Sequence, residues 1–343
     1  MSRGPYARNQ MPNNKISAIV LTDAHTNDPG SYVNPLVRSV LSSLNRHINI
    51  STSDDYYSLV SRVSSVQDNF DVIIVFLRSG QLFKHPGLFD EFRLPVVVVE
   101  HDAYQNSLDW HPRYRAWTHY FSQNPVAALC VSGNQAFSDL YGKIPGRVKR
   151  IAKAAPANFL KSNINKSGRY CLFGTIQLGI YIERNDLFDA IRAHTIYDRI
   201  IRKWSLYGVS YLLSQIIKIK PDISRIDFAY TEMQQVLRYY SAVIICDRGL
   251  REPMMKHFEV AALGLVPFRD DECVEELEGH GYRDGESMVV YENVDDLKEK
   301  MRFYANHLNL MNRIQETARE VTRQHTWEKR AEELVSFIAA EFL

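Results

Sequence analysis

Short apolar runs recur along this chain, and stretches with helical spacing separate them. Residues 71–77, DVIIVFL, and residues 94–99, LPVVVV, carry almost no polar side chain. A strand that is apolar on both faces must be covered on both faces, which is typical of a parallel sheet between layers of helices. Further strands are predicted over residues 15–21, 127–131, 169–173, 204–207, 242–246, 266–267 and 288–291. The alternation predicts an α/β fold built from doubly wound sheets.

The spacing of apolar residues predicts helices over residues 33–44, 231–240, 295–308 and 327–342, the last with Thr326 as N-cap. Residues 147–166 interrupt the alternation, because they are basic at first and then rich in Pro, Ala, Asn and Ser. A chain of 343 residues suggests about two domains. We therefore expect two Rossmann-like domains that face a cleft. The expected segments are a disordered lead-in at 1–14, domains at 15–152 and 168–325, a linker at 153–167, and a C-terminal helix at 326–343 that could pack back on the first domain.

The composition is that of a soluble globular protein, with 45% hydrophobic and 24% charged residues. The formal net charge of +1 argues against a protein that coats nucleic acid. The four cysteines lie far apart, without zinc-binding spacing, and are expected to be reduced thiols. The N-terminus has no apolar signal-peptide core, and no apolar run approaches the roughly 18 residues of a membrane span. These features predict a cytoplasmic protein.

Several common catalytic motifs are absent from the sequence. No GxGxxG follows the first strand, which disfavours a nicotinamide dehydrogenase. The sequence also lacks the P-loop of NTPases, the GxSxG elbow of α/β-hydrolases and the HExxH motif of zinc proteases. The remaining candidate for chemistry is a charged helix.

Residues 251–268, REPMMKHFEVAALGLVPF, predict a helix that Pro253 opens and Gly264 closes. The backbone N–H groups of Met254 and Met255 would point out of its positive end, where phosphate binds readily. Lys256 would add a full charge, and Glu259 could accept two hydrogen bonds from a ribose diol. Glu252 would share the face of Glu259, two turns away. The alternative is a surface helix with two Glu–Lys pairs.

The wider context of this helix resembles the donor domain of GT-B glycosyltransferases, in particular the family-4-like group with paired glutamates. The segment FEVAALGLVPF resembles the family pattern E-A-x-A-x-G-x-P-V, and the terminal HTW followed by a helix is typical of the family. The resemblance covers residues 168–343 well and the N-terminal half less closely. It implies an acceptor-side N-terminal domain and a C-terminal domain that binds a nucleotide sugar.

The resemblance also implies roles for single residues. Glu259 corresponds to the glutamate that holds the ribose, and Glu252 to the one beside the donor sugar and phosphates, although the spacing here is one residue shorter than in the family. Arg184 corresponds to the basic residue that pairs with the diphosphate, and Lys256 to a basic position just before the second glutamate in some relatives. Tyr230 falls where the family shapes the base pocket. His101 and Asp102 follow a strand as in the family's element near the donor sugar, and His101 could act there as a catalytic acid or base. Asp23 and Gly30 match the location of the family's acceptor loop.

The implied reaction moves a sugar from a guanosine or uridine diphosphate sugar to a hydroxyl of a glycan, glycoprotein or lipid-linked acceptor, with retention of configuration. A lysine, an arginine and a helix N-terminus in a dry cleft could stabilise the leaving diphosphate. We therefore expect no metal and no cofactor apart from the donor, and no DxD metal site is evident in the sequence. Domain closure would keep water from the donor.

Other functions remain open at the level of sequence. A nucleotide-sugar epimerase or a phosphorylase-like protein could use the same fold, and a phosphorylase would normally carry pyridoxal phosphate on a lysine. A non-catalytic protein that binds sugar nucleotides is a candidate from a different class. Residues 199–220 place basic residues beside aliphatic ones, which leaves peripheral contact with a membrane open. The sequence does not give the oligomeric state.

Overall fold

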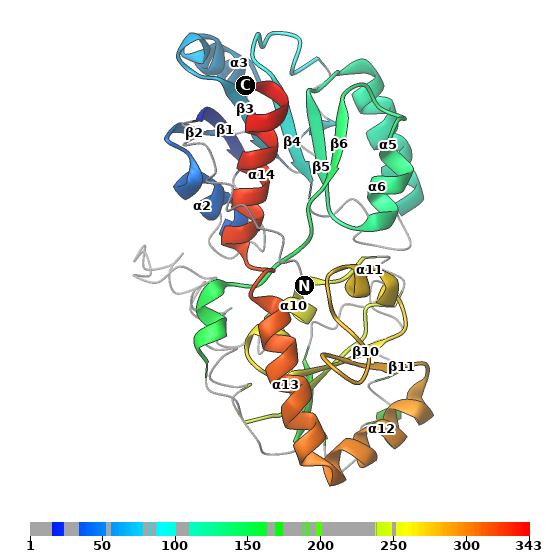
Figure 1. Ribbon diagram of the computed structural model, residues 1–343. Coiled ribbons are helices and arrows are strands. Elements are labelled where there is room, and N and C mark those ends of the chain that lie inside the picture. The colour runs from blue at the N-terminus through cyan, green and yellow to red at the C-terminus, as the bar shows by residue number, and fades with distance from the viewer. Residues whose placement is uncertain are drawn as a thin grey trace, which may run out of the picture.

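The chain folds into two α/β domains, one above the other in Figure 1, which shows the computed structural model. The structure describes residues 16–23, 34–52, 56–77, 82–83, 87–100, 110–162, 169–173, 187, 190–191, 197–200, 237, 239–248 and 252–343. Predicted features at other positions lie outside the described residues. Within the described residues, no helix is long and apolar enough to cross a membrane.

The N-terminal domain contains a six-stranded parallel sheet with the strand order β2-β1-β3-β4-β5-β6. Helices cover both of its faces: α3, α5 and α6 contribute to the core on one face, and α2 with α14 to the core on the other. The strands are β1 Ser17–Asp23, β2 Arg46–Thr52, β3 Val72–Phe76, β4 Val96–Glu100, β5 Ala128–Val131 and β6 Arg147–Arg150. The helices are α2 Asn34–Ser43, α3 Tyr56–Ser64, α5 Trp110–Gln123 and α6 Asn134–Leu140, with a 3-10 turn at Gln67–Asn69.

The C-terminal domain contains a five-stranded parallel sheet with the order β11-β10-β9-β7-β8. Its strands are β7 Tyr170–Phe173, β8 Tyr197–Ile200, β9 Ala242–Ile245, β10 Val266–Asp270 and β11 Val289–Tyr291. Its helices are α10 Met255–Ala262, α11 Val274–Gly279, α12 Val294–Asn306 and α13 Leu308–Thr322, preceded by a 3-10 helix η2 at Ala157–Lys161. The predicted α/β class with doubly wound sheets is therefore confirmed.

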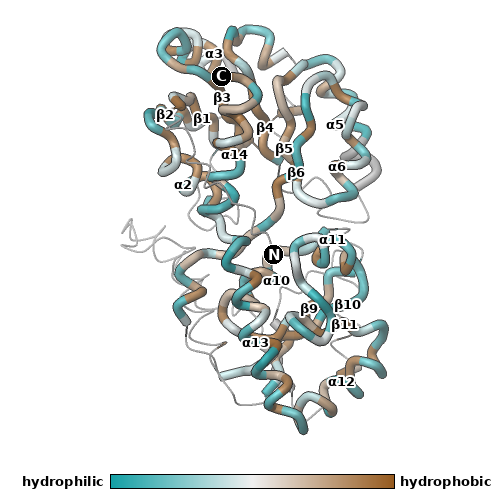
Figure 2. Tube along the Cα trace, in the orientation of Figure 1, coloured by the Kyte–Doolittle hydropathy of each residue, from teal (hydrophilic) through white to brown (hydrophobic). Residues whose placement is uncertain are grey.

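The apolar runs form the central strands, whereas the edge strands β2, β6 and β8 were not predicted. Every residue of β3, β4 and β5 is buried, and the tube in Figure 2 is brown along much of β4. The missed strands β2 and β6 pair on one side only and carry the polar sequences RHINIST and RVKR. An edge strand faces water and needs no unbroken apolar run. The predicted strand 204–207 lies outside the described residues, and the structure has β8 at 197–200.

Two crossovers join the domains, and they are hydrogen-bonded to each other. The Ala155 N–H donates to the His325 carbonyl at 3.0 Å, and the Trp327 N–H donates to the Ala155 carbonyl at 3.1 Å. After the second crossover, helix α14, Trp327–Phe342, runs back along the N-terminal domain (Figure 1). Its apolar face packs into the core of that domain through Ala331, Leu334 and Ile338. The C-terminal helix therefore belongs structurally to the N-terminal domain.

Replacing Thr326 with valine is expected to lower the free energy of unfolding by about 1 kcal/mol. The Thr326 hydroxyl caps α14 by accepting the Lys329 N–H at 3.3 Å, as the sequence predicted. Valine keeps the branched shape of the side chain and removes the acceptor. Thr326→Ser keeps the acceptor and serves as the control. Urea denaturation measures the change, and equal stability of the valine and serine variants would contradict the capping role.

Candidate functional site

Helix α10 carries three of the predicted donor-binding residues, Met255, Lys256 and Glu259, at the carboxyl edge of the C-terminal sheet. Phe258, Val260 and Ala261 are buried in the domain core, which fixes the face that the helix turns inward. Gly264 ends the helix with a φ of 75°, and the Leu265 N–H donates to the Val260 carbonyl at 3.1 Å. This confirms the predicted glycine stop. The predicted start is wrong by two residues, because the helix begins at Met255 and Pro253 lies before the N-cap.

Glu252 lies outside the helix and does not share a helical face with Glu259, contrary to the expectation from spacing. It is only 1% exposed. One carboxylate oxygen accepts the Ser132 hydroxyl at 2.6 Å, and the other accepts the Lys153 ammonium at 2.6 Å. Both partners come from the N-terminal domain and the first crossover. The carboxylate therefore lies in the contact between the two domains, and its predicted role beside the donor sugar stays a prediction.

The backbone N–H groups of Met254 and Met255, which were predicted to face phosphate, differ in their hydrogen bonding in the structure. The Met254 N–H donates to the Asp247 carboxylate at 3.4 Å, and its predicted role toward phosphate stays a prediction. The Met255 N–H is the first of the helix and has no acceptor within the described part of the chain. The Met254 N–H is therefore engaged within the protein, and the predicted role of the Met255 N–H stays a prediction.

Lys256 and Glu259 lie on α10 three residues apart, so their side chains share one side of the helix. Glu259 is 5% exposed, and Lys256 is half-buried. Both side chains interact with other groups of the protein. Both residues lie on the helix that follows the carboxyl end of β9. Doubly wound domains bind nucleotides at this edge of the sheet.

A charged network that the sequence analysis missed supports the start of α10. Arg269 is fully buried in β10 and donates to the Asp270 carboxylate at 3.3 Å. The other Asp270 oxygen accepts the Asp247 N–H at 2.6 Å, and Asp247 in turn accepts the Met254 N–H. The sequence signal that could have revealed this network is the charged residues that directly follow the apolar runs of β9 and β10. The network connects the ends of β9 and β10 to the N-cap of the helix.

Three histidines, of which His257 belongs to α10 itself, pack among aromatic rings. The ring centroid of His257 lies 4.4 Å from that of Tyr282, and those of His280 and His325 lie 5.1 Å apart. His257 is fully buried, and neither ring nitrogen has a hydrogen-bond partner among the residues that the structure describes. Burial, with Arg269 next in weight, holds the pKa of His257 well below its ordinary value. The three rings form a histidine cluster that stays neutral near pH 7.

The same cause acts on the other two members of the histidine cluster. Burial, followed by the charge of Arg150, lowers the pKa of His280 to about 3. Burial, followed by the charge of Arg330, lowers the pKa of His325 to about 4. No group of three or more His, Cys, Asp or Glu side chains within the described residues is arranged to hold a metal ion.

The other predicted site residues are distributed as follows. Asp23 ends β1 and is buried at the carboxyl edge of the N-terminal sheet. His101, Asp102, Gly30, Arg184 and Tyr230 lie outside the described residues. Their predicted roles stay predictions.

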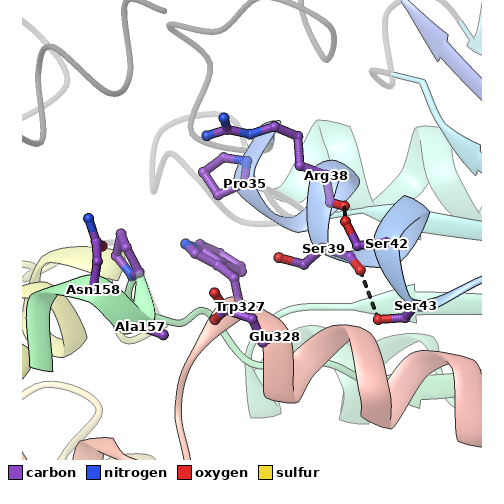
Figure 3. A pocket seen from close by; sticks show the side chains of 10 residues that line it. Pro35, Arg38, Ser39, Ser42, Ser43, Ala157, Asn158, Trp327 and Glu328 are labelled. Carbon is purple, nitrogen blue, oxygen red and sulfur yellow. Dashed lines mark hydrogen bonds between the residues drawn. The ribbon is translucent and has the colours of Figure 1, made fainter.

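A pocket of about 600 Å³ opens between α2, η2 and the start of α14. Figure 3 shows Arg38, Ser39 and Trp327 among its lining. The Ser42 and Ser43 hydroxyls donate to carbonyls of their own helix at 2.9 and 2.8 Å. Of the predicted donor-binding residues that the structure describes, none lines this pocket. It is distinct from the site on α10.

Comparisons with known proteins agree with the two-domain α/β fold described above. Residues 187–336 match a family described as glycosyl transferase-like. No curated protein sequence matches the chain. Similar solved structures include HepE of Anabaena in complex with UDP and glucose, with a TM-score of 0.64 and 11% identity over 95% of this chain and 100% of that one.

Two further solved structures share the fold at low identity. An E. coli structure described as trehalose-6-phosphate bound with UDP-2-fluoro glucose has a TM-score of 0.57 and 9% identity, over 94% of this chain and 99% of that one. A putative UDP-N-acetylglucosamine 2-epimerase of Listeria monocytogenes has a TM-score of 0.50 and 13% identity, over 96% of both chains. At these identities the likeness concerns the fold. The C-terminal part of the chain thus matches a glycosyltransferase-like family, and the chain as a whole has the two-domain GT-B fold of glycosyltransferases.

Proposed function

We propose that this protein is a glycosyltransferase that moves a sugar from a nucleoside diphosphate sugar to a hydroxyl group of a glycan or lipid-linked acceptor. The observation that carries the proposal is the placement of Lys256 and Glu259 on α10, at the carboxyl edge of the second sheet and beside the contact between the domains. The match of residues 187–336 to a glycosyltransferase-like family supports it.

The diphosphate of the donor would bind at the start of α10. The Met255 N–H and the positive end of the helix dipole attract anions, and Lys256 adds a full charge. Charge builds on the diphosphate as the glycosidic bond breaks, so these groups would bind the transition state more tightly than the ground state. Arg184 is proposed as a second cation there. Together they would let the reaction proceed without a divalent metal.

Glu259 would hold the nucleoside. A carboxylate can accept a hydrogen bond from each hydroxyl of a ribose, and it is one helical turn beyond the phosphate-binding end. Tyr230 would line the base pocket, and His101 and Glu252 would lie beside the donor sugar. We propose uridine rather than guanosine as the base, since the HepE structure holds UDP. Retention at the anomeric carbon is part of the proposal through the resemblance to family-4 enzymes.

An epimerase is the second candidate, favoured by the likeness to the putative UDP-N-acetylglucosamine 2-epimerase. Such an enzyme would bind the same donor but change the configuration of its sugar. It would need no acceptor. The two functions therefore differ in what is formed when donor alone is supplied.

The experiment is to incubate the purified protein with UDP-glucose, UDP-N-acetylglucosamine and GDP-mannose, with and without a glycan mixture. Release of nucleoside diphosphate that accelerates at least about 10-fold with acceptor is expected for a transferase. Interconversion of nucleotide sugars without acceptor would indicate the epimerase. A protein that none of the three donors stabilises or reacts with would contradict both.

A further inference from the structure

Two carboxylates of the C-terminal domain bind the turn between β5 and α6 of the N-terminal domain. The Glu252 carboxylate accepts the Ser132 hydroxyl at 2.6 Å, and the Glu276 carboxylate accepts the Asn134 N–H at 2.9 Å. Gly133 between them has a φ of 81°, a conformation that glycine adopts without strain. The turn thus offers two neighbouring donors to the other domain. This contact, the β5–α6 junction, fixes the domains at the carboxyl edge of the first sheet.

Lys153 completes the β5–α6 junction from the first crossover. Its ammonium lies 2.6 Å from Glu252 Oε1 and 3.6 Å from the Met254 sulfur. The side chains of Lys153 and Glu252 are only 4% and 2% exposed. A buried charge without its partner is strongly unfavourable, so each of the two groups holds the other in place. The junction therefore ties the crossover to the segment that leads into α10.

The docking of the domains through Glu252 also fixes the start of α10. Glu252 stands two residues before Met254, which is the N-cap of α10. The next residue, Met255, packs against the core of the N-terminal domain. A shift of the domains at this point would therefore shift the first turn of the helix.

We propose that Lys153 is a positioning residue that acts through Glu252 and holds the start of α10 where the diphosphate would bind. The inference rests on the proposed function, since it assigns the nucleotide to α10. Lys153 does not touch the donor in this account, because its ammonium is buried against Glu252. The start of α10 then has the position that binds the nucleotide only while the two domains are docked. Loss of Lys153 would weaken nucleotide binding without removing any group that contacts the nucleotide.

The first test is hydrogen exchange without ligand on wild type, Lys153→Met and Lys161→Met. Lys161 is an exposed lysine of the same linker region and is the matched control. Exchange in peptides over residues 128–136 and 252–260 is expected to rise about 10-fold or more in Lys153→Met only. Unchanged exchange in both peptides would overturn the proposal. If Lys153→Met does not fold, the double variant Lys153→Met/Glu252→Gln, which removes both charges of this pair, takes its place.

The second test is calorimetric titration with UDP. The dissociation constant is expected to rise about 10- to 100-fold in Lys153→Met and to stay raised in the double variant, although its melting temperature recovers. Recovery of the melting temperature separates positioning from stability. If wild type binds UDP and both variants bind it equally well, the positioning role is wrong and the proposed function stands. If wild type binds neither UDP nor GDP, the proposed function fails, and the exchange experiment alone decides whether Lys153 holds α10.

Discussion

Replacing Glu259 with alanine is expected to lower kcat/KM for the nucleotide sugar by about 100- to 1,000-fold while the fold stays intact. In the proposed complex the Glu259 carboxylate accepts two hydrogen bonds from the ribose. A hydrogen bond to a charged group contributes about 1.5–3 kcal/mol. Glu259→Gln keeps one acceptor and should lose less. Steady-state kinetics with donor at varied concentration, with circular dichroism as the check on folding, measures the effect.

Lys256→Ala is the companion variant. It should lower kcat about 10- to 100-fold with a smaller change in KM, because the charge on the diphosphate grows in the transition state. His257→Phe on the same helix and the exposed Glu286→Ala are matched controls that should keep the wild-type rate. Wild-type activity in both Glu259→Ala and Lys256→Ala would contradict the assignment of the donor site to α10.

Acid is expected to destabilise the protein strongly below about pH 6.5, the ordinary pKa of histidine. In the folded state burial lowers the pKa of His280 to about 3 and that of His325 to about 4. The unfolded chain therefore binds more protons between these values and pH 6.5, so the free energy of unfolding falls as the pH falls. The loss at pH 4 is on the order of 3 kcal/mol for each of these histidines.

His257 allows the histidine cluster to be tested by one substitution. Its ring nitrogens have no partners, so His257→Phe removes a titrating group without breaking a hydrogen bond. This variant should be at least as stable as wild type at pH 7 and should lose less stability between pH 7 and pH 5. His307→Gln changes an exposed histidine and is the control. Melting temperatures across this range measure the effect, and equal slopes for wild type and His257→Phe would show that His257 is not buried neutral.

The parts of this fold that follow from local patterns were predictable from the sequence. The buried strands are continuous apolar runs, Thr326 caps a helix with apolar periodicity, and Gly264 takes a left-handed conformation at a helix end. The edge strands β2 and β6 were not predictable in this way, because a strand paired on one side tolerates polar residues.

The partners of the candidate site could not be predicted from spacing. Ser132 and Lys153 lie 120 and 99 positions before Glu252, and only the docking of two domains brings them to its carboxylate. The spacing of seven residues between Glu252 and Glu259 predicted instead that both side chains lie on the same face of one helix. The residues that sequence placed correctly on α10 are those whose position depends on the helix alone, Lys256 and Glu259.

Calorimetric titration of the wild-type protein with UDP shows whether α10 binds the nucleotide. We expect saturable binding at one site with a dissociation constant below about 1 mM, the usual range for enzyme substrates, and a loss of binding in Glu259→Ala. Absence of heat at millimolar UDP, or equal affinity in wild type and Glu259→Ala, would contradict the claim that α10 binds the nucleotide.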